Sequence, residues 1–428
     1  AVHHTIAAVW RIESARIVAA VARRVHDLGV AEELAQDALV AALEHWPTDG
    51  VPQNPGAWLM TTAKHRAFDH LRHRQMADAR HGDIASDLEA MEAHVVPDFT
   101  DALDTAREHA VIGDDLLRLI FTACHPVLGT DARVALTLKL LGGLTTHEIA
   151  RAFLVPDATI AQRIVRAKRT LAQKQVPFEV PRKADLDERL DSVLEVIYLV
   201  FNEGYSATAG DDWMRPALCD EALRLGRTLA ALMPQHAEVL GLLALMELQA
   251  SRAKARVAAD GTPVLLLEQD RARWDRLQIS RGLAALQNAI RLGGARLPYT
   301  LQAAIAACHA SALQAQDTDW ARIAALYSVL ARVMPSPVIE LNRAVAVGKA
   351  SGPASGPASA LAIVEALVEE AALRDYPSLP VVHGDLLQQL GRYAEAHAAF
   401  ERAADLTRNT RERTVMLARA QACKDLMG

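Results

Sequence analysis

The segment from Leu144 to Leu171, LTTHEIARAFLVPDATIAQRIVRAKRTL, constrains the fold of this chain most strongly. Thr145 and Glu148 have the spacing of a capping box, which predicts that a helix begins there. Pro156 cannot continue a helical hydrogen-bond ladder, and Asp157 after it is expected to cap a second helix. Two short helices joined by a tight turn are the pattern of a helix-turn-helix.

The second of these helices is expected to have two contrasting faces. Its apolar residues recur at helical spacing and are Ile160, Ile164, Ala167 and Leu171. The opposite face is polar and basic and carries Thr159, Gln162, Arg163, Arg166 and Arg169. Arg and Gln have planar groups that pair with base edges in the major groove, and Lys168 is placed to contact flanking phosphates. A basic face can also be a solvated surface, but the chain has a net charge of -6, so this positive charge is local and favours DNA binding.

Length and composition indicate a mainly helical protein of several domains. The 428 residues are consistent with about three domains, and the aromatic content of 4% favours helices over strands. Neither a run of about 18 uncharged apolar residues nor a signal peptide is recognisable, so we expect a cytoplasmic protein that contacts no membrane. The four cysteines form no CxxC pair, so we expect neither a disulfide framework nor a zinc ribbon.

The N-terminal quarter predicts three helices. Residues 5–27 have helical periodicity, and Gly29 is expected to end this first helix. Residues 31–46, AEELAQDALVAALEHW, predict a second helix, followed by a loop over residues 47–54 that is rich in Pro and Gly. Asn54 and Pro55 then have the cap and first-turn order that begins a third helix.

The third helix, PGAWLMTTAKHRAFDHLRHRQ, mixes aromatic residues with cations. That mixture suits a strand of unpaired bases, although aromatic residues at helical spacing more often belong to a core. His65, Asp69 and His73 lie four residues apart on one face, but no third helix offers an evident partner for a metal site. Neither a Gly-rich phosphate loop, a nucleophile elbow nor an HExxH motif is present, so we expect no enzymatic activity, metal or cofactor.

The second helix, the third helix and the helix-turn-helix together resemble the two domains of extracytoplasmic-function sigma factors, which are initiation subunits of bacterial RNA polymerase. The whole chain is similar to a subgroup that carries a tetratricopeptide-like C-terminal extension. The resemblance implies an all-α fold with sigma domain 2 at residues 1–75 and sigma domain 4 at 114–174. An acidic linker at 76–113, a second linker at 175–186 and the extension at 187–428 complete the expected order.

The resemblance also implies which residues bind polymerase and DNA. Core polymerase would be bound by Glu33, Gln36 and Asp37. The loop at residues 47–54 would hold a flipped base. The minus-ten element would be met by Asn54, Lys64, His65, Arg66 and Arg72. The minus-thirty-five element would be read by Thr159, Gln162, Arg163, Arg166, Lys168 and Arg169. Ala161 departs from the family, because related proteins often carry a longer polar residue at that position.

The extension is expected to be a stack of paired helices. Small and aromatic residues near its end have the spacing of one tetratricopeptide repeat: Gly384, Gly391, Tyr393, Ala396, Phe400 and Ala403. Residues 351–359, SGPASGPAS, predict a low-complexity surface loop. A polar and aromatic cluster follows the first helix of the extension and either faces a ligand or forms an exposed turn; its members are Asn202, Glu203, Tyr205, Asp211, Asp212 and Trp213.

Two functions remain open at this point. In the first, the chain is a sigma subunit that binds core RNA polymerase and promoter DNA, and its extension regulates it in cis through contacts with the sigma domains or the linker. In the second, it is a one-component helix-turn-helix regulator or scaffold whose repeats bind a peptide or protein partner.

Overall fold

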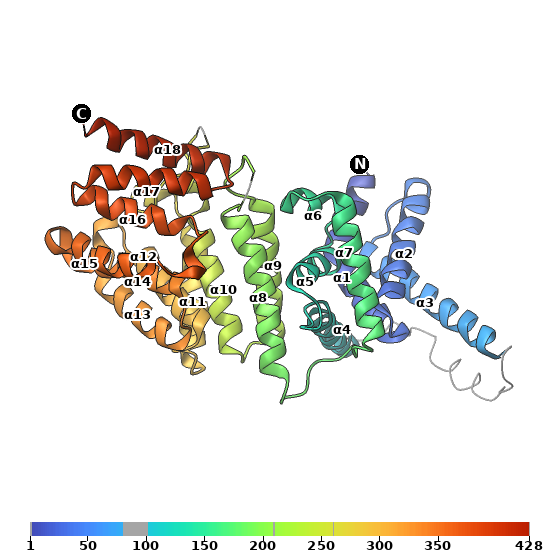
Figure 1. Cartoon of the computed structure of the whole chain (residues 1–428). Helices are drawn as coiled ribbons and strands as arrows, with labels where there is room; N and C mark the ends of the chain where they lie inside the picture. The colour runs from blue at the N-terminus through green and yellow to red at the C-terminus, as the bar shows by residue number, and fades with distance from the viewer. Residues whose placement is uncertain (1, 80–101, 209, 260, 428) are drawn as a thin grey trace. The chain divides into compact units, whose positions relative to one another are not determined.

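The computed structural model describes residues 2–79, 102–208, 210–259 and 261–427 (Figure 1). Within these ranges the regular structure is helical, and the β-structure is limited to two isolated bridges, so the predicted all-α fold is confirmed. The chain forms two compact units, residues 1–196 and 197–428, and the boundary falls inside helix α8 (Leu186–Tyr205). None of the helices in the described ranges combines the length and apolar composition needed to cross a bilayer.

The first unit is built around its N-terminal helix. Its helices are α1 (Val2–Val25), α2 (Leu28–Asp49), α3 (Pro55–Ala79), α4 (Ala102–Ala123), α5 (Thr130–Leu140), α6 (Thr146–Phe153) and α7 (Asp157–Gln173), followed by the start of α8. Helix α1 packs against α2, α3 and α4. Alanine is frequent among the buried residues of α1 and α2, which allows these helices to approach closely.

Two predicted helix ends in this unit are wrong. Helix α1 ends at Val25, since the next residue, His26, has a left-handed φ of 53°. Asp27 caps α2 by accepting the Val30 backbone N–H at 3.0 Å. Gly29 therefore lies inside α2 and does not end α1. The loop predicted at 47–54 begins only at Gly50, because Pro47 lies in the last turn of α2, where a missing N–H removes just one ladder hydrogen bond.

The predicted acidic linker at 76–113 lies mainly outside the described residues, which omit 80–101. Its described ends are helical, because α3 continues to Ala79 and α4 begins at Ala102.

The start of α8 packs within the first unit. Arg133 of α5 donates a hydrogen bond to Ser192 Oγ at 2.6 Å, and Arg189 donates one to the Phe121 carbonyl at 2.8 Å. Ser192 in turn donates to the Cys124 carbonyl at 2.5 Å. These contacts hold the first half of α8 against α4 and α5, so the boundary between the units lies beyond the expected linker at 175–186.

The second unit is a series of helices that pack mainly on their neighbours in sequence (Figure 1). Its helices are α9 (Pro216–Leu232), α10 (Ala237–Ala250), α11 (Arg276–Arg291), α12 (Pro298–Ser311), α13 (Trp320–Val333), α14 (Pro337–Ala350), α15 (Gly352–Leu367), α16 (Ser378–Gln389), α17 (Tyr393–Leu406) and α18 (Thr410–Asp425). Packing between sequence neighbours is typical of stacked helical hairpins.

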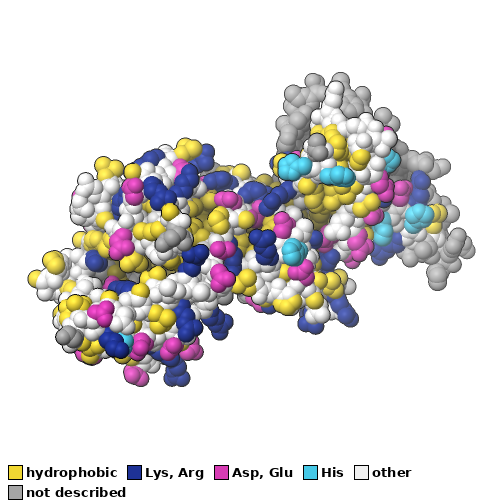
Figure 2. Space-filling model, turned by 90° about the horizontal axis from the view of Figure 1, so that it is seen from above, with side chains coloured by type: hydrophobic (Ala, Val, Ile, Leu, Met, Phe, Trp, Pro, Cys, Tyr) yellow, Lys and Arg dark blue, Asp and Glu magenta, His cyan; other side chains and the backbone are white. Residues whose placement is uncertain are grey.

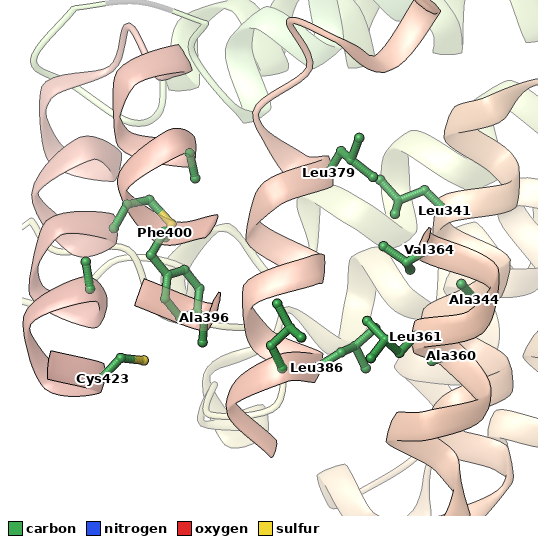
Figure 3. Close-up of a cluster of buried hydrophobic side chains, with 14 of the residues drawn as sticks. Leu341, Ala344, Ala360, Leu361, Val364, Leu379, Leu386, Ala396, Phe400 and Cys423 are labelled. Carbon is green, nitrogen blue, oxygen red and sulfur yellow. The ribbon is translucent and has the colours of Figure 1, made fainter. Parts of the chain in front are cut away.

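The core near the end of this unit joins α14, α15, α16, α17 and α18 (Figure 3). Leu341, Leu361 and Val364 are buried on the side of α14 and α15, and Phe400 is buried on α17. A Cβ atom on Gly384 would lie 3.0 Å from the Phe400 ring, so the absence of a side chain allows α16 to approach α17. The predicted pairing of these two helices is confirmed.

The surface loop predicted at 351–359 is wrong, because this segment forms the first turns of α15. Pro353 occupies the first turn, where its missing N–H removes no helical hydrogen bond. Gly356 and Pro357 are buried, and a Cβ atom on Gly356 would overlap the Gly348 carbonyl oxygen. The small residues that suggested a loop therefore allow close contact between α14 and α15.

Candidate nucleic-acid and polymerase interfaces

The first helix of the helix-turn-helix is capped as the sequence predicts. Thr145 Oγ1 accepts the Glu148 backbone N–H at 3.1 Å, and the Thr145 backbone N–H donates to Glu148 Oε2 at 2.7 Å. These reciprocal bonds form a capping box at the start of α6. Leu154 then takes a left-handed conformation with φ 51° and ends the helix.

The start of the second helix differs from the prediction by one residue. Pro156 is the N-cap residue of α7, with extended backbone angles, and Asp157 is the first residue inside the helix. Asp157 makes no side-chain cap, so that prediction is wrong. Its carboxylate lies 3.1 Å from His147 Nδ1 on α6 instead, which links the two helices.

Helix α7 has one buried face and one exposed face, as expected. The apolar residues are nearly inaccessible: Ile160 is 1% exposed, Ile164 5%, Ala167 2% and Leu171 4%. Gln162, Arg166 and Arg169 are exposed, whereas Thr159, Arg163 and Lys168 are half-buried. The exposed face therefore presents two guanidinium groups and one amide to solvent.

Two of the predicted DNA-contacting cations form ion pairs inside the first unit. Arg163 Nη2 lies 2.8 Å from Asp131 Oδ2 of α5, and Lys168 Nζ lies 2.8 Å from Glu32 Oε2 of α2. Asp131 is exposed, whereas the Glu32 side chain is only 8% exposed. The Lys168 pair is thus the more strongly shielded from solvent.

The predicted polymerase-docking residues lie on the exposed side of α2. Glu33, Gln36 and Asp37 are all exposed. Gln36 Nε2 donates to Glu32 Oε1 at 3.0 Å, and Asp37 lies 3.7 Å from Arg66 of α3. Both partners of this second pair are about half exposed, so the pair contributes at most about 1 kcal/mol to stability.

Helix α3 presents the residues predicted for the minus-ten element. Asn54 Oδ1 accepts the Ala57 backbone N–H at 3.1 Å, as expected of an N-cap residue. His65 and Arg72 are exposed, and Lys64 and Arg66 are half-buried. The arrangement leaves cationic side chains along α3.

The aromatic residues of α3 pack against neighbouring helices. Trp58 meets Trp46 edge to face, with ring centroids 5.5 Å apart. The guanidinium of Arg24 lies 5.8 Å from the Phe68 ring centroid. Both α3 rings are half-buried, which favours the core interpretation of these aromatic residues over base stacking.

Sequence reasoning missed two buried carboxylates that connect α1 and α2 to later helices. Glu32 faces both Lys168 and Lys139, the latter at 4.0 Å. Asp115 of α4 is 1% exposed and lies 3.2 Å from Arg23 of α1. Burial raises the pKa of Asp115, and the positive charge of Arg23 opposes that rise. The available signal for Glu32 was an acidic residue on the apolar side of a predicted helix.

The surface in Figure 2 carries Lys and Arg side chains interspersed with Asp and Glu. In the described ranges, His, Cys, Asp and Glu form no group of three that could hold a metal ion. This finding covers His65, Asp69 and His73 of α3.

Comparison with known families assigns three parts of the chain. Residues 12–76 match sigma-70 region 2, and residues 118–171 match sigma-70 region 4. Residues 189–290 match a family of unknown function, DUF6596. No solved structure matches the chain.

Several known proteins are similar in sequence. An uncharacterized protein of Rhizobium meliloti (strain 1021) is 44% identical over 394 residues, which cover 92% of this chain and 90% of that protein. The ECF RNA polymerase sigma factor SigK of Mycobacterium ulcerans (strain Agy99) is 31% identical over 163 residues, covering 36% of this chain and 78% of SigK. The probable ECF RNA polymerase sigma factor SigI of Mycobacterium tuberculosis (strain H37Rv) is 28% identical over 180 residues, covering 42% of this chain and 58% of SigI.

Regions 2 and 4 occur in the order that a sigma subunit requires, which decides against the one-component regulator. Such subunits are not enzymes, and their partners are core RNA polymerase and promoter DNA. The extension contains the family of unknown function. The chain therefore belongs to the extracytoplasmic-function sigma factors of the sigma-70 family, which direct transcription initiation.

Proposed function

We propose that the first unit uses three surfaces to bring core polymerase to its promoter. The polymerase surface consists of Glu33, Gln36 and Asp37. The minus-ten surface consists of Asn54, Lys64, His65, Arg66 and Arg72. The minus-thirty-five surface consists of Thr159, Gln162, Arg163, Arg166, Lys168 and Arg169. The observation that carries this proposal is the division of α7 into a buried apolar face and an exposed face with planar polar groups.

The six minus-thirty-five residues have different roles in this proposal. Gln162 and Arg166 are exposed and reach base edges, where a bidentate Arg–guanine contact is the commonest specific one. When DNA binds, Lys168 gives up its ion pair with Glu32 and contacts a phosphate instead. Arg163 likewise breaks its ion pair with Asp131 when DNA binds. DNA binding by α7 is therefore coupled to the loss of contacts within the first unit.

We also propose that the second unit is a tetratricopeptide-like repeat domain that modulates initiation in cis. The paired packing of α16 and α17 around Gly384 and Phe400 supports the repeat assignment. A covalently attached domain has an effective concentration on the order of millimolar, so even a weak contact with the first unit or its polymerase complex is populated. Since polymerase and chromosome share one compartment in bacteria, the proposed location is the cytoplasm.

A shortened chain tests the regulatory part of this proposal. A chain that ends at Val196 keeps the whole first compact unit, including the part of α8 that packs on α4 and α5. We expect it to bind core polymerase but to give markedly less run-off transcript than the full chain, because a permanently fused extension favours a positive role. The promoter would be selected from a randomised library by the full chain and core polymerase.

Circular dichroism and core-polymerase binding of the shortened chain serve as controls for folding. Equal run-off yields from the two chains, at matched polymerase occupancy, would remove the regulatory role but leave the sigma assignment intact.

A further inference from the structure

The aromatic residues that follow α8 meet two arginines from a later segment. The guanidinium of Arg256 lies 3.4 Å from the Tyr205 ring centroid and 4.3 Å from the Trp213 ring centroid. The guanidinium of Arg252 lies 5.8 Å from the Tyr205 ring centroid and 5.9 Å from that of Trp274. We call Tyr205, Trp213, Arg252, Arg256 and Trp274 the arginine–aromatic cluster.

The loop that supplies Trp213 is an ordered part of the second unit. Asn409, at the start of α18, is 1% exposed and donates its side-chain amide to the Asp212 carbonyl at 3.0 Å. The Thr410 backbone N–H donates to the Gly210 carbonyl at 3.1 Å. These bonds tie the loop to the last helix and fix the position of the cluster.

Positive charge in the cluster is not balanced by carboxylates. Arg256 is 6% exposed and donates to the Tyr205 carbonyl, and burial lowers its pKa to about 10. Arg252 is half-buried and makes its contacts with ring faces. In the described ranges, neither arginine forms an ion pair with Asp or Glu. A half-buried guanidinium in these surroundings favours an anion from outside the chain.

Buried hydrogen-bond donors beside these arginines also lack acceptors. The indole N–H groups of Trp213 and Trp274 are buried without a hydrogen-bond partner among the described residues, as is Nε of Arg271. The guanidinium of Arg271 lies 4.7 Å from the Trp274 ring centroid. Buried donors are seldom left unpaired in native proteins, so several unpaired donors in one region indicate an acceptor-rich ligand.

Tyrosines gather around the same cluster. Of the six tyrosines in the chain, five are half-buried in the second unit and are linked by a ring contact or by electrostatic interaction: Tyr198, Tyr205, Tyr299, Tyr327 and Tyr376. Tyr198 and Tyr299 meet edge to face at 5.3 Å. Burial raises the pKa of Tyr327 to about 12, and the charge of Arg252 opposes that rise. This raised pKa keeps the Tyr327 hydroxyl protonated at neutral pH, so it can donate a hydrogen bond.

We propose that Arg252 and the surrounding tyrosine hydroxyls bind an oxyanion, either a carboxylate or a phosphate, carried by a small molecule. The rings of Tyr205 and Trp274 hold the Arg252 guanidinium by cation–π contact and leave its N–H groups to pair with two oxygens. Arg256 supplies positive potential from a fixed position. The site lies within the second unit and does not depend on the role proposed above for that unit.

Thermal unfolding of the full chain with added inorganic phosphate or acetate tests this site, with chloride at equal ionic strength as the reference. We expect at least one oxyanion to raise the unfolding temperature saturably, because it binds only the folded state. Arg252→Gln should weaken that binding about 10- to 100-fold, as expected for a lost charge-assisted contact. Arg281→Gln changes an exposed arginine on α11 and should change the oxyanion affinity by no more than about twofold.

Tyr327→Phe provides a second test that removes only a hydroxyl, and it should weaken binding severalfold even if Arg252→Gln fails to fold. Protection by phosphate alone or by acetate alone identifies which oxyanion the ligand carries. The proposal is overturned if neither ion protects beyond chloride. Equal losses in Arg281→Gln and the site variants would also overturn it, because binding would then reflect general charge.

Discussion

Glu32 of α2 and Lys168 of α7 form a shielded ion pair, with Nζ 2.8 Å from Oε2, although they lie 136 residues apart in sequence. The pair joins a helix of sigma-70 region 2 to the proposed DNA-reading helix of region 4. In this pair the carboxylate of Glu32 binds a lysine that we expect to contact a DNA phosphate.

Glu32→Gln should therefore have two effects. Loss of the buried carboxylate leaves Lys168 without its partner and should lower the unfolding free energy of the first unit by about 1 to 3 kcal/mol. The released Lys168 should raise the affinity of the free protein for DNA severalfold. Urea unfolding and fluorescence anisotropy measure the two effects. Glu44→Gln, at an exposed position of the same helix, is the control and should change neither value.

Substitutions on α7 separate base reading from phosphate binding. Arg166→Ala should cost roughly 1 to 3 kcal/mol of promoter binding and relax the preference at one upstream base pair. Lys168→Ala should weaken all sequences alike and reduce the salt dependence. Promoter selection with each variant checks this, with Arg182→Ala as an exposed control outside α7. A uniform loss for both variants would show that Arg166 binds only phosphate.

The contact between α14 and α15 predicts a large effect of one small substitution. Gly356→Ala places a Cβ atom against the Gly348 carbonyl oxygen and should lower the stability of the second unit by about 1 to 3 kcal/mol or more. Ser355→Ala changes the exposed neighbour on the same helix and should be nearly neutral. Thermal unfolding of both full-length variants checks the difference, and equal melting temperatures would contradict the packing described for α14 and α15.

Acid should destabilise the second unit through His309. Burial, together with the positive charges of Arg252 and Arg271, lowers the pKa of His309 to about 4. Because the unfolded histidine titrates near 6.5, its stabilising contribution is complete above that pH and is lost as the pH falls from about 6.5 to 4. The loss amounts to about 3 kcal/mol at most. His309→Gln should remove this part of the pH dependence of the unfolding free energy. His73→Gln, at an exposed position, should retain it.

The sequence predicts the local features of the DNA-binding helices well, because they depend on short-range patterns. The capping box at Thr145 and the apolar stripe of α7 follow from spacing within a few residues. The Glu32–Lys168 pair joins distant segments, so no local pattern specifies it. The roles of the individual polymerase- and DNA-contacting residues stay predictions, because they depend on partners outside the chain.

Composition misled the prediction where packing decides the structure. Gly and Pro in residues 351–359 favour a loop when considered locally, yet close contact with α14 places them in a helix. The sequence predicts only part of the arginine–aromatic cluster, because Tyr205 and Trp213 lie close together in the chain. Their arginine partners come from a segment about 40 to 50 residues later, which only the fold brings near.

Run-off transcription with purified core polymerase tests the central claim most directly. The full chain should initiate at its selected promoter, and Glu33→Lys combined with Asp37→Lys should abolish most of the transcript by weakening docking. Each reversed charge is exposed on α2, so the domain should stay folded. Glu44→Lys, on the same helix, should transcribe like the unmodified chain. Full activity and unchanged core binding in the Glu33 and Asp37 double variant would contradict the assignment of the docking surface.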